Sequence, residues 1–254
     1  MIFPLSDDDR HLLKPAWVTI GLLLANIALF LYQAGHAAFT EGWSIVPREI
    51  TTGVDLVGTV ALGDGNGPDL VLTAGPKPVF LTLLSGMFLH GSLMHLGGNM
   101  LYLWIFGDNV EHRFGPGKFL LFYLLSGLVG SLAHIWLAPD SVIPMLGASG
   151  AISGVLGAYV VLFPWNQVNT LFFFRVVSLP ALFVIGIWAG MKVFAGWGSL
   201  AGNVEGAGVA YAAHIGGFLA GALMGGIGRW LMKEEPDTVM LRHYERNPRT
   251  RRLW

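Results

Sequence analysis

The stretch KFLLFYLLSGLVGSLAHIWLA, residues 118–138, decides the class of fold. After Lys118 it contains no Asp, Glu, Lys or Arg, and a helix needs about 20 such residues to cross the hydrocarbon core of a bilayer. The whole chain agrees with this segment. Of its 254 residues, 54% are hydrophobic and 12% are charged, and the mean hydropathy is +0.59. We therefore predict an all-α polytopic membrane protein whose main solvent is the bilayer.

Six apolar blocks lie along the chain, and we predict one transmembrane helix in each. Their approximate ranges are 15–35, 84–106, 118–138, 147–164, 175–195 and 207–232. All six belong to one membrane domain, 15–232, which includes a long polar outer loop at 36–80. A short segment, 1–14, precedes this domain and a basic tail, 233–254, follows it. The chain has no cysteine, which excludes disulfides and thiolate chemistry.

The distribution of Lys and Arg predicts the orientation. If the N-terminus is inside, the outer segments carry only Arg48, Lys77 and Lys192, and the inner segments carry Arg10, Lys14, Arg113, Lys118, Arg175, Arg229, Lys233, Arg242, Arg246, Arg249, Arg251 and Arg252. Because cytoplasmic loops are enriched in these residues, we expect both termini in the cytoplasm. The N-terminal segment has the features of neither a secretory signal nor a transit peptide, which suits a multi-pass protein of a bacterial plasma membrane. The tail is expected to face lipid headgroups and not nucleic acid.

Polar side chains inside the spans are costly in lipid and therefore indicate function. His95, Ser149 and His214 each lie near the N-terminal part of an even-numbered span, so all three lie toward the same membrane face. Small residues at i+3 or i+4 spacing allow two helices to approach closely. Two such stripes are Ser149, Ser153 and Gly157 in the fourth span, and His214, Gly217, Gly221, Gly225 and Gly228 in the sixth. This approach would bring Ser149 within hydrogen-bonding reach of His214.

A serine beside an imidazole indicates nucleophilic catalysis. The imidazole is a base that activates the hydroxyl, and because no carboxylate lies at comparable depth we predict a dyad of Ser149 and His214. Hydrolysis also requires donors for the oxyanion. The free N–H groups at the start of the helix that carries Ser149 can serve, together with His95 and Asn99, which share one helix face at i,i+4.

Each of these features also has a structural interpretation. The sequence GASG, 147–150, is common in plain helix packing. His95 with Asn99 can form an interhelical hydrogen-bond clamp, and His90 and His134 can be structural. Glu111 and Arg113 are expected to form an ion pair or cap a backbone. A metal site of His90, His95 and His214 has poor spacing for one helix face and lacks a carboxylate.

Four sequence elements together resemble the rhomboid family of intramembrane serine proteases, over about residues 84–225. HLGGN contains His95 and Asn99, GASG contains Gly147, Ser149 and Gly150, and AHIGGFLAG contains His214, Gly217 and Gly221. The fourth element, GDNVEHRFGPGKFLLFY, places Gly107, Glu111, Gly115 and Tyr123 at the spacing of that family. Each element alone is weak, whereas the four in this order are specific.

The resemblance implies a six-helix bundle and a serine endopeptidase that needs no cofactor and no metal. It implies Ser149 as nucleophile, His214 as general base, and His95, Asn99 and the Ser149 amide as oxyanion donors. The implied substrates are transmembrane segments in the bilayer, cleaved near a helix-destabilised site of small residues.

The resemblance also implies how substrates enter. The loop 196–208 would cover the site, and substrates would pass between the second and fifth spans, near Trp104, Phe106 and Trp188. One position departs from the pattern. Ser153 stands where some members carry an aromatic residue stacked on the catalytic histidine.

Two other functions are compatible with parts of the pattern. One is a catalytically silent relative that binds transmembrane segments, although such relatives usually lack the serine or the histidine. The other is a transporter or proton channel with His95, His134 and His214 as a relay. The spans show neither intramembrane Asp or Glu nor the repeat symmetry common in transporters.

Overall fold

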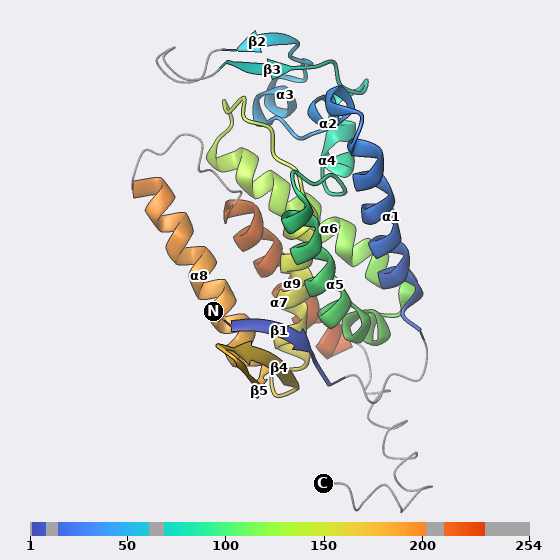
Figure 1. Ribbon diagram of the computed structural model, residues 1–254, viewed down its shortest axis with the longest axis vertical. Helices are drawn as coiled ribbons and strands as arrows, with labels where there is room; N and C mark the ends of the chain where they lie inside the picture. Colours follow the sequence, from blue (N-terminus) through green and yellow to red (C-terminus); the bar gives the residue numbers. More distant parts are fainter. Residues whose placement is uncertain (1, 9–14, 61–68, 202–210, 232–254) are drawn as a thin grey trace, which may run out of the picture.

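A computed structural model describes residues 2–8, 15–60, 69–201 and 211–231. Six longer helices form a bundle (Figure 1): α1 (Trp17–Gln33), α5 (Leu93–Phe114), α6 (Pro116–Leu137), α7 (Ser149–Leu162), α8 (Ala181–Ala201) and α9 (Tyr211–Leu231). Each of the six apolar ranges overlaps one of these helices. By length and composition, α6 and α9 can cross a membrane, whereas α1, α7 and the apolar part of α8, Ala181–Phe194, are shorter. The count of six spans and the cytoplasmic termini stay predictions, and the basic tail lies outside the described residues.

Two predicted spans begin too early. The second was expected from residue 84, but residues 79–85 form a 3₁₀ turn, η1 (Val79–Leu81), and a short helix, α4 (Thr82–Ser85). The long helix α5 starts only at Leu93, where the Ser92 hydroxyl accepts a hydrogen bond from the His95 N–H at 3.1 Å. The fifth was expected from residue 175, but residues 175–180 form a strand and α8 follows it.

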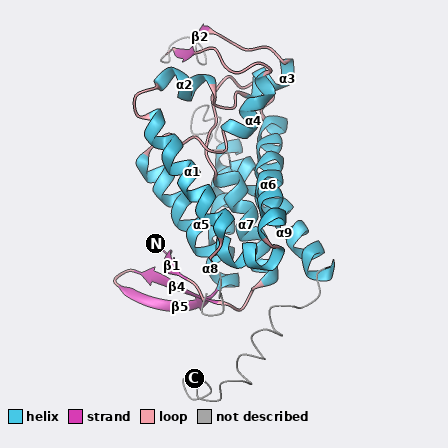
Figure 2. Cartoon of the chain, turned by 90° about the vertical axis from the view of Figure 1, so that its right-hand side faces the viewer, coloured by secondary structure: helices cyan, strands magenta, loops and turns pink. Residues whose placement is uncertain are grey.

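The prediction of an all-α fold is wrong at both ends of the bundle. At one end, β1 (Ile2–Ser6), β4 (Gln167–Phe172) and β5 (Arg175–Pro180) form an antiparallel sheet in the order β1-β4-β5 (Figure 2). At the other end, the long loop folds into α2 (Ala37–Gly42), α3 (Pro47–Thr52) and a two-stranded sheet of β2 (Gly58–Val60) and β3 (Leu70–Leu72). With three residues each, β2 and β3 are too short for hydrophobic periodicity to separate them from loops, and the prediction missed β1, β4 and β5 although they have five or six residues.

The helix α7 lies at the centre of the bundle, and α5, α6 and α9 pack around it (Figure 1). All ten residues from Gly150 to Tyr159 are buried. The closest packing is against α9, where a Cβ on Gly217 would meet the Gly150 carbonyl and a Cβ on Gly221 would meet that of Gly154. The helices therefore touch backbone to backbone, as stripes of small residues permit. The contact face of α7 is formed by Gly150, Gly154 and Gly157, so Gly157 of the predicted stripe lies on it, and the glycines that follow Ser149 and Ser153 take the places of those two serines.

The segment 107–117 was expected to be a polar loop, but it continues α5 to Phe114. Gly115, with φ of +79°, then ends α5 and leads directly into α6. Glu111 is 4% exposed, and its carboxylate accepts hydrogen bonds from the Val18 N–H, the Thr19 N–H and the Thr19 hydroxyl, at 2.7–3.0 Å. It therefore caps α1, the role expected of this residue on structural grounds. Gly107 makes room for Thr19, since a Cβ there would lie 3.1 Å from the Thr19 methyl.

Candidate active site

An extended segment positions Ser149 at the first turn of α7. Met145 pairs with Ile45 of the long first loop through two backbone hydrogen bonds of 2.8 and 2.9 Å. The Gly147 N–H then donates to the Gly86 carbonyl at 2.7 Å. Gly147 has φ of +131°, a conformation that a side chain would strain, and this turn directs the chain into the helix. The first loop therefore determines where the serine lies.

Ser149 and His214 are in direct contact. The Ser149 Oγ lies 2.8 Å from the His214 Nε2, at the starts of α7 and α9. His214 is 6% exposed, and within the described part of the chain its Nδ1 has no hydrogen-bond partner. If the serine hydroxyl donates to Nε2, the ring proton is on Nδ1. The pair is thus a two-residue unit, with no carboxylate from the described residues behind the imidazole.

Two aromatic rings flank His214, and they take the role that a third polar residue would have in orienting the imidazole. The ring of Trp188 from α8 lies 6.3 Å from the imidazole, centroid to centroid, and that of Tyr211 lies 6.5 Å away, both in edge geometry. Ser153 does not take part, because its hydroxyl donates to the Ser149 carbonyl at 2.6 Å. The aromatic contact that this position cannot supply comes from Trp188 on α8 and from Tyr211, three residues before His214 on α9 itself.

His95 and Asn99 face the segment that leads into Ser149. A Cβ on Gly147 would lie 2.8 Å from the His95 Nε2 and 3.8 Å from the Asn99 Nδ2, so glycine is needed here to leave room for the His95 ring, whereas Asn99 would be in ordinary contact. One cavity is lined by His95, Asn99, Ser149 and His214, but not by Gly147. Two side-chain donors and the first N–H groups of α7 therefore surround the serine.

Asn99 is oriented by His90, which the sequence suggested only as a structural residue. The Asn99 Nδ2 lies 2.9 Å from the His90 Nε2, and the His90 backbone N–H donates to the Gln33 side chain at 3.0 Å. His90 is 2% exposed. The rings of His90 and His95 lie 5.2 Å apart, and within the described ranges no three His, Cys, Asp or Glu side chains gather as metal ligands.

The cavity beside the serine has a volume of about 240 Å³ and opens between α5 and α8. It is lined by polar groups near Ser149 and by Met94, Tyr102, Ile152 and Trp188 farther out, with the amine of Lys192 among them. The aromatic rings of Tyr102 and Trp188 lie 6.4 Å apart and bring the two helices together.

This arrangement corrects the predicted entrance residues. Trp188 lines the cavity, as expected, but Phe106 is fully buried against Tyr159 and Trp104 is 60% exposed on another face of α5. Tyr102, and not Phe106 or Trp104, is the α5 aromatic residue that lines the cavity. Of the predicted covering loop, residues 196–201 belong to α8 and residues 202–208 lie outside the described residues.

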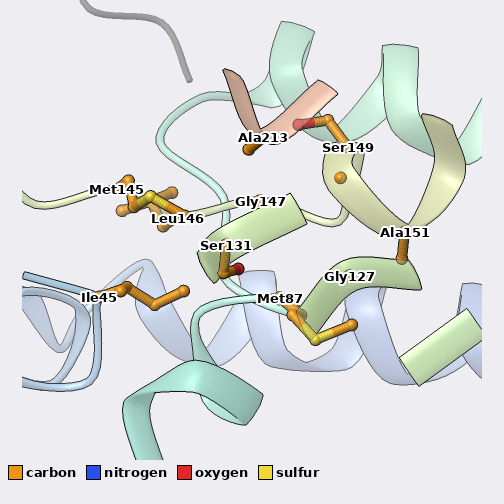
Figure 3. A pocket seen from close by; sticks show the side chains of 11 residues that line it. Ile45, Met87, Gly127, Ser131, Met145, Leu146, Gly147, Ser149, Ala151 and Ala213 are labelled. Carbon is orange, nitrogen blue, oxygen red and sulfur yellow. The ribbon is translucent and has the colours of Figure 1, made fainter. Parts of the chain in front are cut away.

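A second and much smaller cavity lies on the other side of Ser149 (Figure 3). Its volume is about 20 Å³, near that of one water molecule. Ile45, Met87 and Met145 form its apolar wall, and Ser131 is among the residues that line it. Only a small group can enter it without movement of the side chains around it.

Comparison with known proteins agrees with this architecture. Residues 77–230 match the family model of the Rhomboid domain. The chain belongs to the rhomboid family. The rhomboid fold implies a polytopic helical membrane protein, and the motif glycines, Glu111, Ser149 and His214 all fall within the matched range.

Three rhomboid relatives illustrate the similarity. The chain is 35% identical over 149 residues to the mitochondrial Rhomboid protein 1 of Saccharomyces cerevisiae, 38% over 141 residues to the Rhomboid protease GluP of Bacillus subtilis, and 36% over 145 residues to RHOMBOID-like protein 4 of Arabidopsis thaliana. These regions cover 55–57% of this chain but only 41%, 24% and 32% of the relatives. The chain therefore matches less than half of each relative.

Proposed function

We propose that this rhomboid protein is an intramembrane serine endopeptidase, which hydrolyses peptide bonds in or near transmembrane segments with Ser149 and His214. The observation that carries the proposal is the 2.8 Å contact between the Ser149 Oγ and the His214 Nε2, beside a cavity lined with hydrogen-bond donors. Membership of the family supports the same activity.

The mechanism follows from these groups. His214 Nε2 takes the proton of the Ser149 hydroxyl as the oxygen attacks the carbonyl carbon of the scissile bond. The negative oxygen that forms accepts hydrogen bonds from the Ser149 N–H and the side chains of His95 and Asn99. The intermediate then collapses, the C–N bond breaks, and the amine leaves with the proton from His214.

The second half of the reaction releases the acyl group. A water molecule in the cavity attacks the ester on Ser149, and His214 takes its proton. The ester C–O bond breaks and the serine oxygen recovers that proton from His214. No cofactor or metal is required in this scheme, and a cavity of about 240 Å³ provides space for the water.

The substrates follow from the position of the site. Entry between α5 and α8, past Tyr102 and Trp188, would let a segment move laterally from the bilayer. The 20 Å³ cavity beside Ser149 favours a small side chain next to the cleaved bond. Arg113 and Arg229 lie in the last turns of α5 and α9, Lys118 lies in the first turn of α6, and Arg175 begins β5, whereas the site lies at the starts of α5, α7 and α9. This distribution of charge favours an outward-facing site and cytoplasmic termini.

The proposal is tested by cleavage in vesicles. The purified chain is reconstituted with a fluorescent model transmembrane segment that has small, helix-destabilising residues at its centre, and products are identified by mass spectrometry. We expect one cut with the wild-type chain and none with Ser149→Ala or His214→Ala. Cleavage that persists in folded Ser149→Ala would refute the proposed nucleophile, whereas binding without cleavage by the wild-type chain would indicate a silent relative.

A further inference from the structure

One cation in the cavity has no role in the mechanism above. Lys192 lies on α8, one helical turn after Trp188 and on the same face, and it lines the cavity with Ser149 and His214. Its Nζ lies 5.9 Å from the ring centre of Trp188 and 6.0 Å from that of Tyr211. The same two rings also flank His214, so each of them lies close to both the Lys192 amine and the imidazole.

None of the described residues supplies a counter-ion for Lys192. Within the described ranges no carboxylate forms an ion pair with it, and its neighbours are the faces of two aromatic rings. Such cation–π contacts hold an ammonium in position and do not neutralise it. A charge on a membrane helix is costly, and where it faces a water-filled cavity it usually contacts a substrate or an ion. The group that fits here is an anion of the size of a carboxylate.

We propose that Lys192 determines substrate specificity by binding the carboxylate of an Asp or Glu side chain close to the cleaved bond. The inference rests on the proposed protease function and adds a substrate class to it. Lys192 and Ser149 line the same cavity, and an extended chain advances about 3.3 Å per residue, so residues within a few positions of the cleaved bond can come within reach of the Lys192 amine. The contact would be a charge-assisted hydrogen bond.

The experiment measures a preference within each enzyme. The cleaved bond of the model segment is located with the wild-type chain, and Asp, Asn or Lys is then placed at each of the four positions on either side. The readout is the ratio of kcat/KM for the Asp and Asn substrates, in phosphatidylcholine vesicles. We expect a preference for Asp of about 10- to 100-fold at one position, the range expected when a hydrogen bond to a charged group is lost.

Variants of Lys192 assign the preference to its charge. Lys192→Arg should retain it, Lys192→Met should lose it, and Lys192→Glu should favour the Lys substrate at the same position. Lys118→Met is the matched control, because Lys118 is an exposed lysine at the start of α6, outside both cavities, and this variant should keep the wild-type ratio.

Two results would overturn the inference while the protease function stands. One is cleavage by the wild-type chain with no preference for Asp at any position. The other is a preference that persists in Lys192→Met. The series is repeated with phosphatidylglycerol in the vesicles, because a lipid headgroup is a second possible source of the anion. A cleavage rate that depends on this lipid and on Lys192, without a preference for Asp, would assign the site to a headgroup. That result would also overturn the inference. If the wild-type chain cleaves no substrate at all, the proposed function fails and the inference fails with it.

Discussion

Substitution of Gly221 by alanine tests whether the backbone contact between α7 and α9 creates the candidate active site. Gly221 lies two turns after His214 on α9, opposite Gly154, which lies just over one turn after Ser149 on α7. A Cβ on Gly221 would lie 2.5 Å from both the Cα and the carbonyl carbon of Gly154, and nearer still to its oxygen. These are backbone atoms, so no side chain can rotate away.

The magnitude follows from this overlap. Carbon atoms normally approach to about 3.5 Å, so the helices must separate by about 1 Å at this point. A similar shift at the helix starts would lengthen the Ser149–His214 contact from 2.8 Å to about 3.8 Å, beyond the limit of a hydrogen bond. A displacement of about 1 Å in an active site reduces the rate about 100-fold.

The assay is the initial rate of covalent labelling by a fluorescent fluorophosphonate, with folding checked by circular dichroism and gel filtration. Gly226→Ala is the matched control on the same helix, because a Cβ there has no atom within 4 Å. Gly225→Ala should fall between the two, since its Cβ would lie 2.8 Å from the Ala158 Cα. The reasoning is refuted if folded Gly221→Ala labels within about threefold of Gly226→Ala, because that ratio corresponds to less than about 1 kcal/mol.

Three further predictions concern single side chains. Glu111→Gln removes a buried, charge-assisted cap of α1 and should lower the free energy of unfolding by about 1–3 kcal/mol, measured by denaturant titration in micelles, with labelling per folded molecule unchanged; equal stability would show that the charge is unimportant. His90→Leu removes the acceptor that orients Asn99 and should lower kcat about 10-fold with little change in KM, whereas a change in KM alone would place His90 outside the oxyanion site. Glu49, in the long first loop, is buried at 3% exposure; desolvation raises its pKa above 4.5, helped by Asp55 and opposed by the Leu56 N–H. Because the folded state binds this proton more tightly, the stabilisation is complete below pH 4.5 and is lost as pH rises through the raised pKa. The unfolding temperature of Glu49→Gln should therefore fall less than that of the wild type as the pH rises from 4.5 through the raised pKa. Identical pH profiles of the two proteins would contradict the assignment.

The sequence was sufficient to predict the six longer helices and the meeting of Ser149 with His214. The physical reasons are the length of each apolar block and the position of each polar residue along its helix. Apolar blocks of this length can only be helices in lipid, and parallel helices place their first turns at one end. The family assignment, made from four short motifs, is confirmed by the match over residues 77–230. The resemblance also anticipated a contact that hydropathy cannot show, between Ser149 and a histidine 65 residues away.

Other features depend on tertiary contacts that no local pattern records. Two positions of the predicted stripe on α7 were one residue off, because Ser149, Gly150, Ser153 and Gly154 are all small and either face could pack. The strands at both ends are short, and β1 gains its partner β4 only through the folded bundle. Nothing in the sequence singled out Tyr102, and Lys192 was counted only among the outer cations; their positions around one cavity distinguish them.

The central claim is that Ser149 is an activated nucleophile, and covalent labelling tests it most directly. The wild-type chain, Ser149→Ala and His214→Ala are treated with the fluorophosphonate in lipid, and the modified residue is identified by mass spectrometry. We predict a phosphonylated Ser149 in the wild type and no labelling in either folded variant. Labelling of the wild type at another residue, or undiminished labelling in His214→Ala, would contradict the account.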